Sequence, residues 1–132
     1  MEHGGRLQVG IVVRELDPMV DFYAGVLGLD HVGDLRLPDM LMKRFTLGDA
    51  GLKLLAYDDP PTMGSQPGGP SARTAGLRYL TVEVPDVAEA VTRCLTAGRT
   101  VTVPTFVHEP TGATVAIVED PEGNWVELVQ RQ

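Results

Sequence analysis

The chain has 132 residues, 43% hydrophobic and 22% charged, which is typical of one soluble globular domain. Its 18 Asp and Glu outnumber its 11 Lys and Arg, and the net charge of −7, with no basic cluster, argues against a nucleic-acid partner. No apolar run reaches membrane-span length, the N-terminus is polar, and the single Cys94 has no internal partner. We therefore expect no membrane partner and no signal peptide, and a cytoplasmic location.

The first half begins with an extended run, 7–13, followed by an amphipathic helix. Asp17 suits the N-cap of this helix, Pro18 its first turn, and Gly28 its positive-φ stop. Apolar residues recur at i, i+3, i+4, i+7 and i+8, namely Met19, Phe22, Tyr23, Val26 and Leu27. Three extended segments are expected after the helix, at 31–37, 42–47 and 52–57.

Residues 58–75 are rich in Pro and Gly and show no periodicity. Their composition is typical of a flexible linker. A structureless stretch of this length inside a compact domain is also typical of a lid over a pocket. The sequence leaves both interpretations open.

The second half repeats the pattern of the first, offset by about 71 residues. An extended run, 77–84, precedes a helix in which Asp86 and Glu89 have the spacing of a capping box and Gly98 provides the stop. Its expected apolar face is Val87, Ala90, Val91, Cys94 and Leu95. Extended segments follow at 100–107, 113–119 and 125–130, the last preceded by a turn signal at Asp120, Pro121 and Gly123.

The sequence thus predicts an α+β fold for a single domain, 1–132. It contains two β-α-β-β-β modules, 6–57 and 76–132. Two such modules related by an approximate two-fold would form a curved mixed sheet around a central cleft. The residues that face the cleft are then the natural site.

This arrangement resembles the vicinal oxygen chelate superfamily, which includes glyoxalase I, extradiol dioxygenases, fosfomycin and bleomycin resistance proteins and methylmalonyl-CoA epimerase. The resemblance rests on "VVRELDPMVDFYAGVLGL" in the first half and "DPEGNWVELVQ" in the second. It implies a metal held by the first and last strands of each half. The corresponding positions here are Gln8, Lys53, Tyr79 and Glu127, of which only Glu127 is a family-typical ligand. We therefore expect no cofactor and disfavour a divalent metal.

Lys53 and Glu127 occupy equivalent strands, so the approximate two-fold would bring them toward each other. They would then form a buried ion pair that fills the vacated metal site. Alternatively, Lys53 and Tyr79 donate hydrogen bonds to a ligand and Glu127 accepts or moves a proton. The sequence does not decide between these two roles.

Several other side chains are candidates for the pocket wall. Strand alternation places Trp125 on the same side as Glu127, either as a stacking surface for a flat ligand or as core beneath a helix. Weaker candidates are Phe106, His108, Tyr23 and Arg44. The three histidines, His3, His31 and His108, have no ligand partner at useful spacing and are interpreted as surface residues.

Three functions are compatible with these observations. The first, which we favour, is a metal-free protein of the bleomycin-resistance kind that sequesters a small organic molecule. The second is a metal-independent isomerase or lyase with Glu127 as general base and Lys53 or Tyr79 stabilising negative charge. The third is glyoxalase-like or dioxygenase chemistry at a metal with atypical ligands. The resemblance also implies a homodimer.

Overall fold

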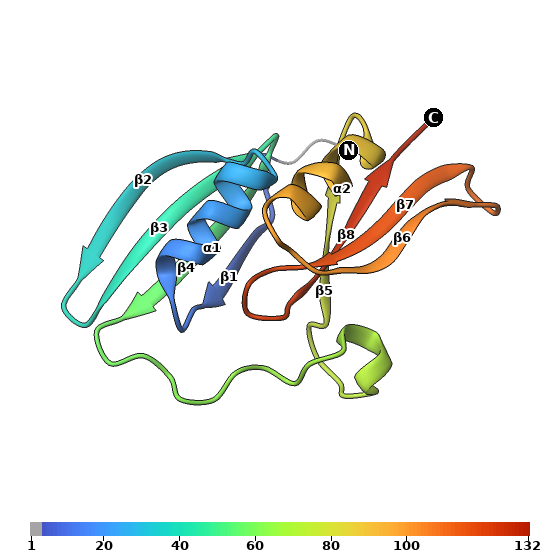
Figure 1. The fold of residues 1–132 in the computed structure, drawn as a ribbon. Helices are drawn as coiled ribbons and strands as arrows, with labels where there is room; N and C mark the ends of the chain where they lie inside the picture. The colour runs from blue at the N-terminus through green and yellow to red at the C-terminus, as the bar shows by residue number, and fades with distance from the viewer. Residues whose placement is uncertain (1–3) are drawn as a thin grey trace. The chain divides into compact units, whose positions relative to one another are not determined.

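A computed structural model describes residues 4–132 (Figure 1). Two compact units make up the chain, the first ending at Gly64 and the second beginning at Ser65. His3 lies outside the described residues. None of the helices in the described part is long and apolar enough to cross a membrane.

The first unit is a four-stranded mixed sheet with one helical segment on it (Figure 1). Its elements are β1 (Gln8–Val12), α1 (Leu16–Val20), η1 (Asp21–Val26), β2 (Asp30–Leu37), β3 (Met40–Leu47) and β4 (Ala50–Tyr57). The strand order is β1-β4-β3-β2, with β1 parallel to β4 and the other pairs antiparallel. The helical segment packs on β4, and the core between helix and sheet includes Met19, Phe22, Phe45 and Leu54, each at most 1% exposed.

The first helix differs from the prediction at its start and in the winding of its C-terminal half. It begins at Leu16 with Glu15 as N-cap, so Asp17 is a first-turn residue and not the cap. Pro18 is still tolerated, because the N–H groups of the first turn have no intrahelical partner. The C-terminal half is a π-helix, in which the Leu27 N–H donates to the Phe22 carbonyl at 2.9 Å. This wider turn still buries Leu27, and Gly28 ends the segment at φ +82° as predicted.

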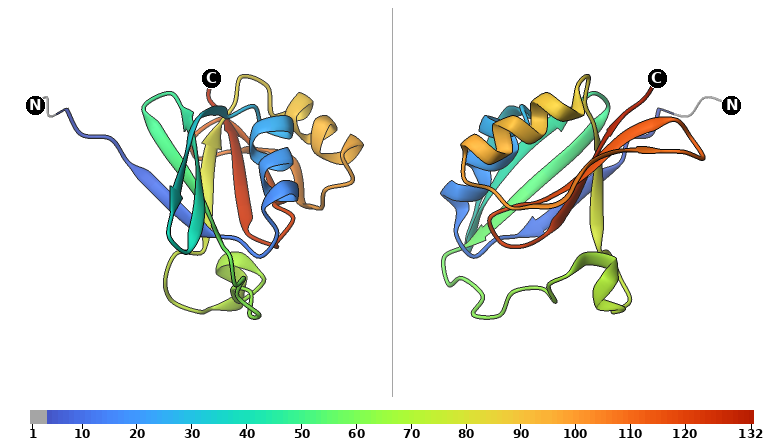
Figure 2. Two further views of the ribbon diagram at one scale, coloured as in Figure 1. Left: turned by 90° about the vertical axis from the view of Figure 1, so that its left-hand side faces the viewer. Right: turned by 45° about the vertical axis from the view of Figure 1, so that its right-hand side comes forward.

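The second unit repeats this plan around a four-stranded mixed sheet (Figure 2). Its elements are η2 (Gly69–Ala72), β5 (Tyr79–Glu83), α2 (Val87–Thr96), β6 (Val101–His108), β7 (Ala113–Glu119) and β8 (Trp125–Gln130). The order is β5-β8-β7-β6, with β5 parallel to β8, so β8 is an interior strand as its apolar composition predicts.

Helix α2 packs on β6, β7 and β8 through Val87, Ala90 and Cys94. Its N-cap is Asp86 as predicted, and the Asp86 side chain accepts from the Glu89 N–H at 3.1 Å. The Gln130 amide oxygen, from β8, accepts from the Val87 N–H at 2.9 Å and satisfies another first-turn donor. The predicted apolar face was too wide, because Leu95 is 59% exposed.

Both modules therefore have the predicted order of elements, and the α+β class is confirmed. The ends of the predicted strands differ from the observed ends by at most two residues. The segment 58–75 departs from the expectation of a structureless stretch, because it contains the short 3-10 helix η2.

Candidate functional site

One face of the second sheet carries the polar and aromatic residues of the candidate site. Along β8, Val126 and Leu128 are fully buried, whereas Trp125 and Glu127 project to the opposite face. The parallel pairing of β5 with β8 sets Tyr79 beside Trp125 and Thr81 beside Glu127. Because paired residues project to the same side, these four side chains form one group.

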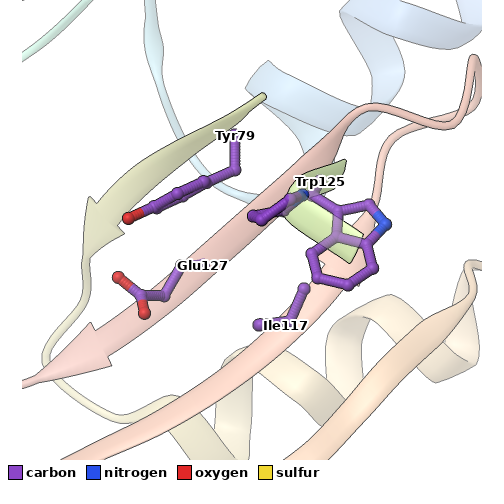
Figure 3. Close-up of a pocket in the computed structure, with 5 residues that line it drawn as sticks. Tyr79, Ile117, Trp125 and Glu127 are labelled. Atoms are coloured by element: carbon purple, nitrogen blue, oxygen red, sulfur yellow. The ribbon is translucent and has the colours of Figure 1, made fainter. Parts of the chain in front are cut away.

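A cavity of about 200 Å³ lies on this face (Figure 3). Its lining residues are Pro70, Tyr79, Ile117, Trp125 and Glu127. The Tyr79 hydroxyl and the Glu127 carboxylate lie together, away from the indole of Trp125 and the Ile117 side chain. The cavity therefore has an aromatic and aliphatic part and a polar part, as sites for small organic molecules commonly do.

Glu127 is held in the polar part by one hydroxyl group. The Thr81 hydroxyl donates to Glu127 Oε1 at 2.9 Å. On the adjacent strand β7, Ile117 is the cross-strand neighbour of Glu127. Among residues 65–132, no Lys, Arg or His forms an ion pair with Glu127. Its carboxylate thus keeps acceptor capacity for a ligand. Sequence reasoning missed Thr81, although its place two residues after Tyr79 puts both on one face.

Trp125 lines the cavity and also packs beneath a helical turn. A Cβ atom on Gly69 would lie 2.3 Å from Cδ2 of Trp125, so the backbone of η2 rests directly on the indole. Gly69 has φ +51°, which also favours glycine. Trp125 is therefore half-buried on the cavity side of β8, and its role as a stacking surface for a flat ligand stays a prediction.

The η2 turn is fixed to the second unit by hydrogen bonds. The Arg78 guanidinium donates to the Gly69 carbonyl at 3.1 Å through Nε and to the Gln66 carbonyl through Nη2. The Ser65 hydroxyl donates to Asn124 Oδ1 at 3.2 Å. Residues 65–72, which we call the wall, are thus held in place, and Pro70 lines the cavity from this segment. Sequence reasoning missed Arg78, which holds the wall.

The turn beneath this wall is organised by Asp120. Its carboxylate is 4% exposed and accepts from the N–H groups of Glu122 and Asn124 at 2.9 and 3.0 Å, and from Asn124 Nδ2 at 2.8 Å. The Gly123 N–H donates to the Asp120 carbonyl at 2.9 Å, which closes the turn that the sequence predicted. Asp120 therefore fixes where β8, with Trp125 and Glu127, begins.

The remaining polar candidates lie on one face of the first unit. Arg44 and Lys53 are cross-strand neighbours, and Gln8 shares their face through its pairing with Gly51. Arg44 lies over Gly33, whose added Cβ would be 2.8 Å from Arg44 Nη2. The pair of Lys53 with Glu127 joins residues of different units and stays a prediction.

Other sequence candidates are not among the residues that line the cavity. Phe106 is 41% exposed on β6 and is not among the lining residues. Tyr23 is fully buried and packs edge-on against Phe22 at 4.9 Å between ring centroids, so it is a core residue. His31 contacts Asp34 at 2.6 Å, and His108 contacts the Thr111 hydroxyl at 2.9 Å; both histidines are exposed, as predicted.

The donor groups do not fit a divalent metal. No group of three or more His, Cys, Asp or Glu residues in the described chain could hold a metal ion. At the positions that the resemblance assigns to metal ligands, Glu127 is the only carboxylate, beside an amide, a phenol and the cation Lys53.

A family model described as "Glyoxalase/Bleomycin resistance protein/Dioxygenase superfamily" matches residues 5–128. Solved structures are similar over nearly the whole chain. SMU.1112c is 25% identical with a TM-score of 0.76, covering 94% of this chain and 96% of that one. A glyoxylase/bleomycin resistance protein/dioxygenase domain from Frankia sp. EAN1pec is 21% identical with a TM-score of 0.78, covering 99% and 100%.

A glyoxalase family protein from Bacillus cereus is 19% identical with a TM-score of 0.82, covering 98% of this chain and 95% of that one. No curated protein matches the chain.

Proposed function

The chain belongs to the glyoxalase/bleomycin resistance protein/dioxygenase superfamily, and on this premise we propose that it binds and sequesters a small organic molecule without a metal. The observation that carries the proposal is the cavity that Tyr79, Ile117 and Trp125 line around one carboxylate, Glu127. Apolar walls provide contact area, and a few polar groups fix the orientation of a ligand.

Each lining residue has a separate role in this proposal. Trp125 offers a flat surface for a ring, and Ile117 and Pro70 add aliphatic contacts. The Glu127 carboxylate, oriented by Thr81, accepts a hydrogen bond from the ligand. The Tyr79 hydroxyl donates or accepts beside it. We also propose that the protein acts in the cytoplasm and forms a homodimer. Sedimentation velocity would test the homodimer.

Trp125 provides the direct test, because it is the only tryptophan in the chain and lines the cavity. A panel of small aromatic and heteroaromatic compounds would be titrated against its emission. We expect saturable changes in the Trp125 emission, and no such signal in Trp125→Phe. Calorimetry should show weaker binding in Trp125→Ala than in the wild type. Phe106→Ala is the matched control, since it removes an exposed aromatic outside the cavity. Equal loss of binding in both variants, or no saturable ligand, would contradict the proposal.

The metal-free part of the proposal has its own test. Protein purified without chelator would be analysed for metal content and titrated by calorimetry with nickel, zinc, manganese and ferrous iron. We expect neither a stoichiometric metal nor a binding heat. One tightly bound metal per chain would contradict the proposal and favour metalloenzyme chemistry.

A further inference from the structure

We propose that the cavity selects planar, positively charged organic groups, such as an amidinium or a protonated nitrogen heterocycle. This inference rests on the proposed function and names the ligand class of the same site. It follows from the charges, the aromatic surfaces and the hydrogen bonds around Glu127.

The cavity wall has a carboxylate and no cation. Glu127 is the only acidic residue among the five lining residues, and none of the five is Lys, Arg or His. Its hydrogen-bond donor is the Thr81 hydroxyl, which is neutral and orients the carboxylate without cancelling its charge. Within residues 65–132, a ligand that reaches Glu127 therefore meets a carboxylate that is paired with no cation.

Three of the five arginines among residues 65–132 make contacts with groups other than Glu127. Arg78 donates to two carbonyl groups of the η2 wall. Arg93 pairs with Glu89 on α2, and Arg131 pairs with Glu83. Residues 65–132 contain no lysine. The other two arginines, Arg73 and Arg99, are not among the residues that line the cavity, so within this unit a ligand can supply the cation beside Glu127.

A second carboxylate adds to the negative field. Glu119 on β7 is the cross-strand neighbour of Trp125, so both project from the same face. Its side chain accepts from the Thr102 hydroxyl at 2.7 Å, again a neutral donor. Trp125 is consequently flanked by Glu119 on the adjacent strand and by Glu127 two residues along its own strand.

The aromatic walls favour the same charge. The faces of Trp and Tyr rings carry partial negative charge and attract cations placed over them. Gly69 already covers part of the Trp125 indole, which leaves a restricted surface beside Tyr79 for a ligand. A flat group with delocalised charge can stack there and still direct N–H donors to the Glu127 carboxylate. A bulky ammonium group stacks less well in this geometry.

Three probes of one shape separate charge from size, namely benzamidine, benzamide and benzoate, which are cationic, neutral and anionic at pH 7. Each would be titrated against the full-length protein by calorimetry and Trp125 emission. We expect benzamidine to bind about tenfold more tightly than benzamide, with benzoate weakest. In Glu127→Gln, the benzamidine affinity should fall to about that of benzamide, so that the preference for the cation disappears. Glu109→Gln removes the same charge from an exposed turn and should leave the preference intact.

The outcomes distinguish this inference from the proposed function. Equal affinities for benzamidine and benzamide, or a preference that survives Glu127→Gln, would overturn the ligand class and leave the binding function standing. Tighter binding of benzoate would overturn it in favour of the predicted pairing of Lys53 with Glu127. Absence of binding by all three probes would also overturn the ligand class, whereas the proposed function is judged by the wider compound panel.

Discussion

The backbone of Gly69 rests on the indole of Trp125 so closely that an added Cβ would lie 2.3 Å from Cδ2. Position 69 favours glycine for two reasons, the close contact with the indole and a φ of +51°, which lies in the left-handed region. The contact joins a Pro- and Gly-rich stretch to the strand that carries Glu127. The close packing of the wall on Trp125 therefore requires a residue without a side chain at position 69.

Gly69→Ala should displace the wall from Trp125. The left-handed backbone costs about 1 kcal/mol for alanine, and the steric overlap adds to it, so we expect the free energy of unfolding to fall by about 1–3 kcal/mol. Trp125 emission should shift to the red as water reaches the indole. Gly76→Ala is the control, because Gly76 also has positive φ, at +112°, but has no atom within 4 Å of an added Cβ. Identical emission spectra for the two variants would contradict the close-contact argument.

Arg78 is predicted to position the same wall without touching a ligand. Arg78→Met removes its donors to Gly69 and Gln66, so amide exchange over residues 65–72 should become faster while exchange in β7 and β8 stays slow. Affinity for cavity ligands should fall several-fold. Arg78→Lys cannot reproduce the forked geometry and should rescue only in part.

Arg99→Met is the matched control. The Arg99 side chain donates to the Ala97 carbonyl, at the C-terminal end of α2 and outside the wall. Unchanged amide exchange over residues 65–72 in Arg78→Met would contradict this prediction and show that the wall keeps its conformation without the Arg78 hydrogen bonds.

Local signals in the sequence were sufficient for most of the fold. Alternation and periodicity act between near neighbours, so the strands, α2, its Asp86 cap and the Asp120 turn were all predictable. The π-helix was not, because residues at i, i+3 and i+4 share a face in both kinds of turn. The predicted cap at Asp17 failed for a related reason, since Glu15 and Asp17 are both acidic and propensity alone placed the start of the helix.

The candidate site depends on pairing between distant segments. Strand alternation could place Trp125 and Glu127 on one face, but the hydrogen bond from Thr81 requires the parallel register of β5 with β8. The packing of Gly69 on Trp125 likewise joins a loop to a strand more than fifty residues later. Composition marked the loop as a linker or lid, and only the tertiary contacts identify part of it as a wall.

Asp120 is predicted to be the most sensitive polar residue of the second unit. Asp120→Ala would leave three N–H donors of the turn without their carboxylate, and charged hydrogen bonds of this kind contribute about 1.5–3 kcal/mol each before relaxation. We expect the free energy of unfolding to fall by about 2–4 kcal/mol in urea titrations. Asp86→Ala, which removes a single cap bond, should cost only about 1 kcal/mol. Equal losses in the two variants would refute the central role of Asp120.

Cys94 should be unreactive in the native protein. Its side chain is fully buried beneath α2, and burial raises the pKa of its thiol, so little thiolate is available for attack. A thiol reagent should modify it only as fast as the unit opens, and urea should accelerate the reaction in parallel with unfolding. Rapid stoichiometric labelling without denaturant would contradict the observed packing of α2.

Asp34 is predicted to make stability depend on acid pH. The hydrogen bond from Lys43, and after it the one with His31, lowers the pKa of Asp34 below its usual value of 3.8. Because the pKa of Asp34 is lower in the folded state than in the unfolded state, its contribution to the free energy of unfolding is fully present above the unfolded-state pKa. This contribution is lost as the pH falls through the folded-state pKa. Asp34→Asn should therefore be less stable than wild type at pH 5, and the difference should shrink below pH about 4. The pair is exposed, so the effect should be small and weakened by salt. Urea titrations of wild type and Asp34→Asn across this pH range measure the difference in stability, and Asp59→Asn is the control for net charge. A stability difference that grows toward acid pH would contradict the prediction.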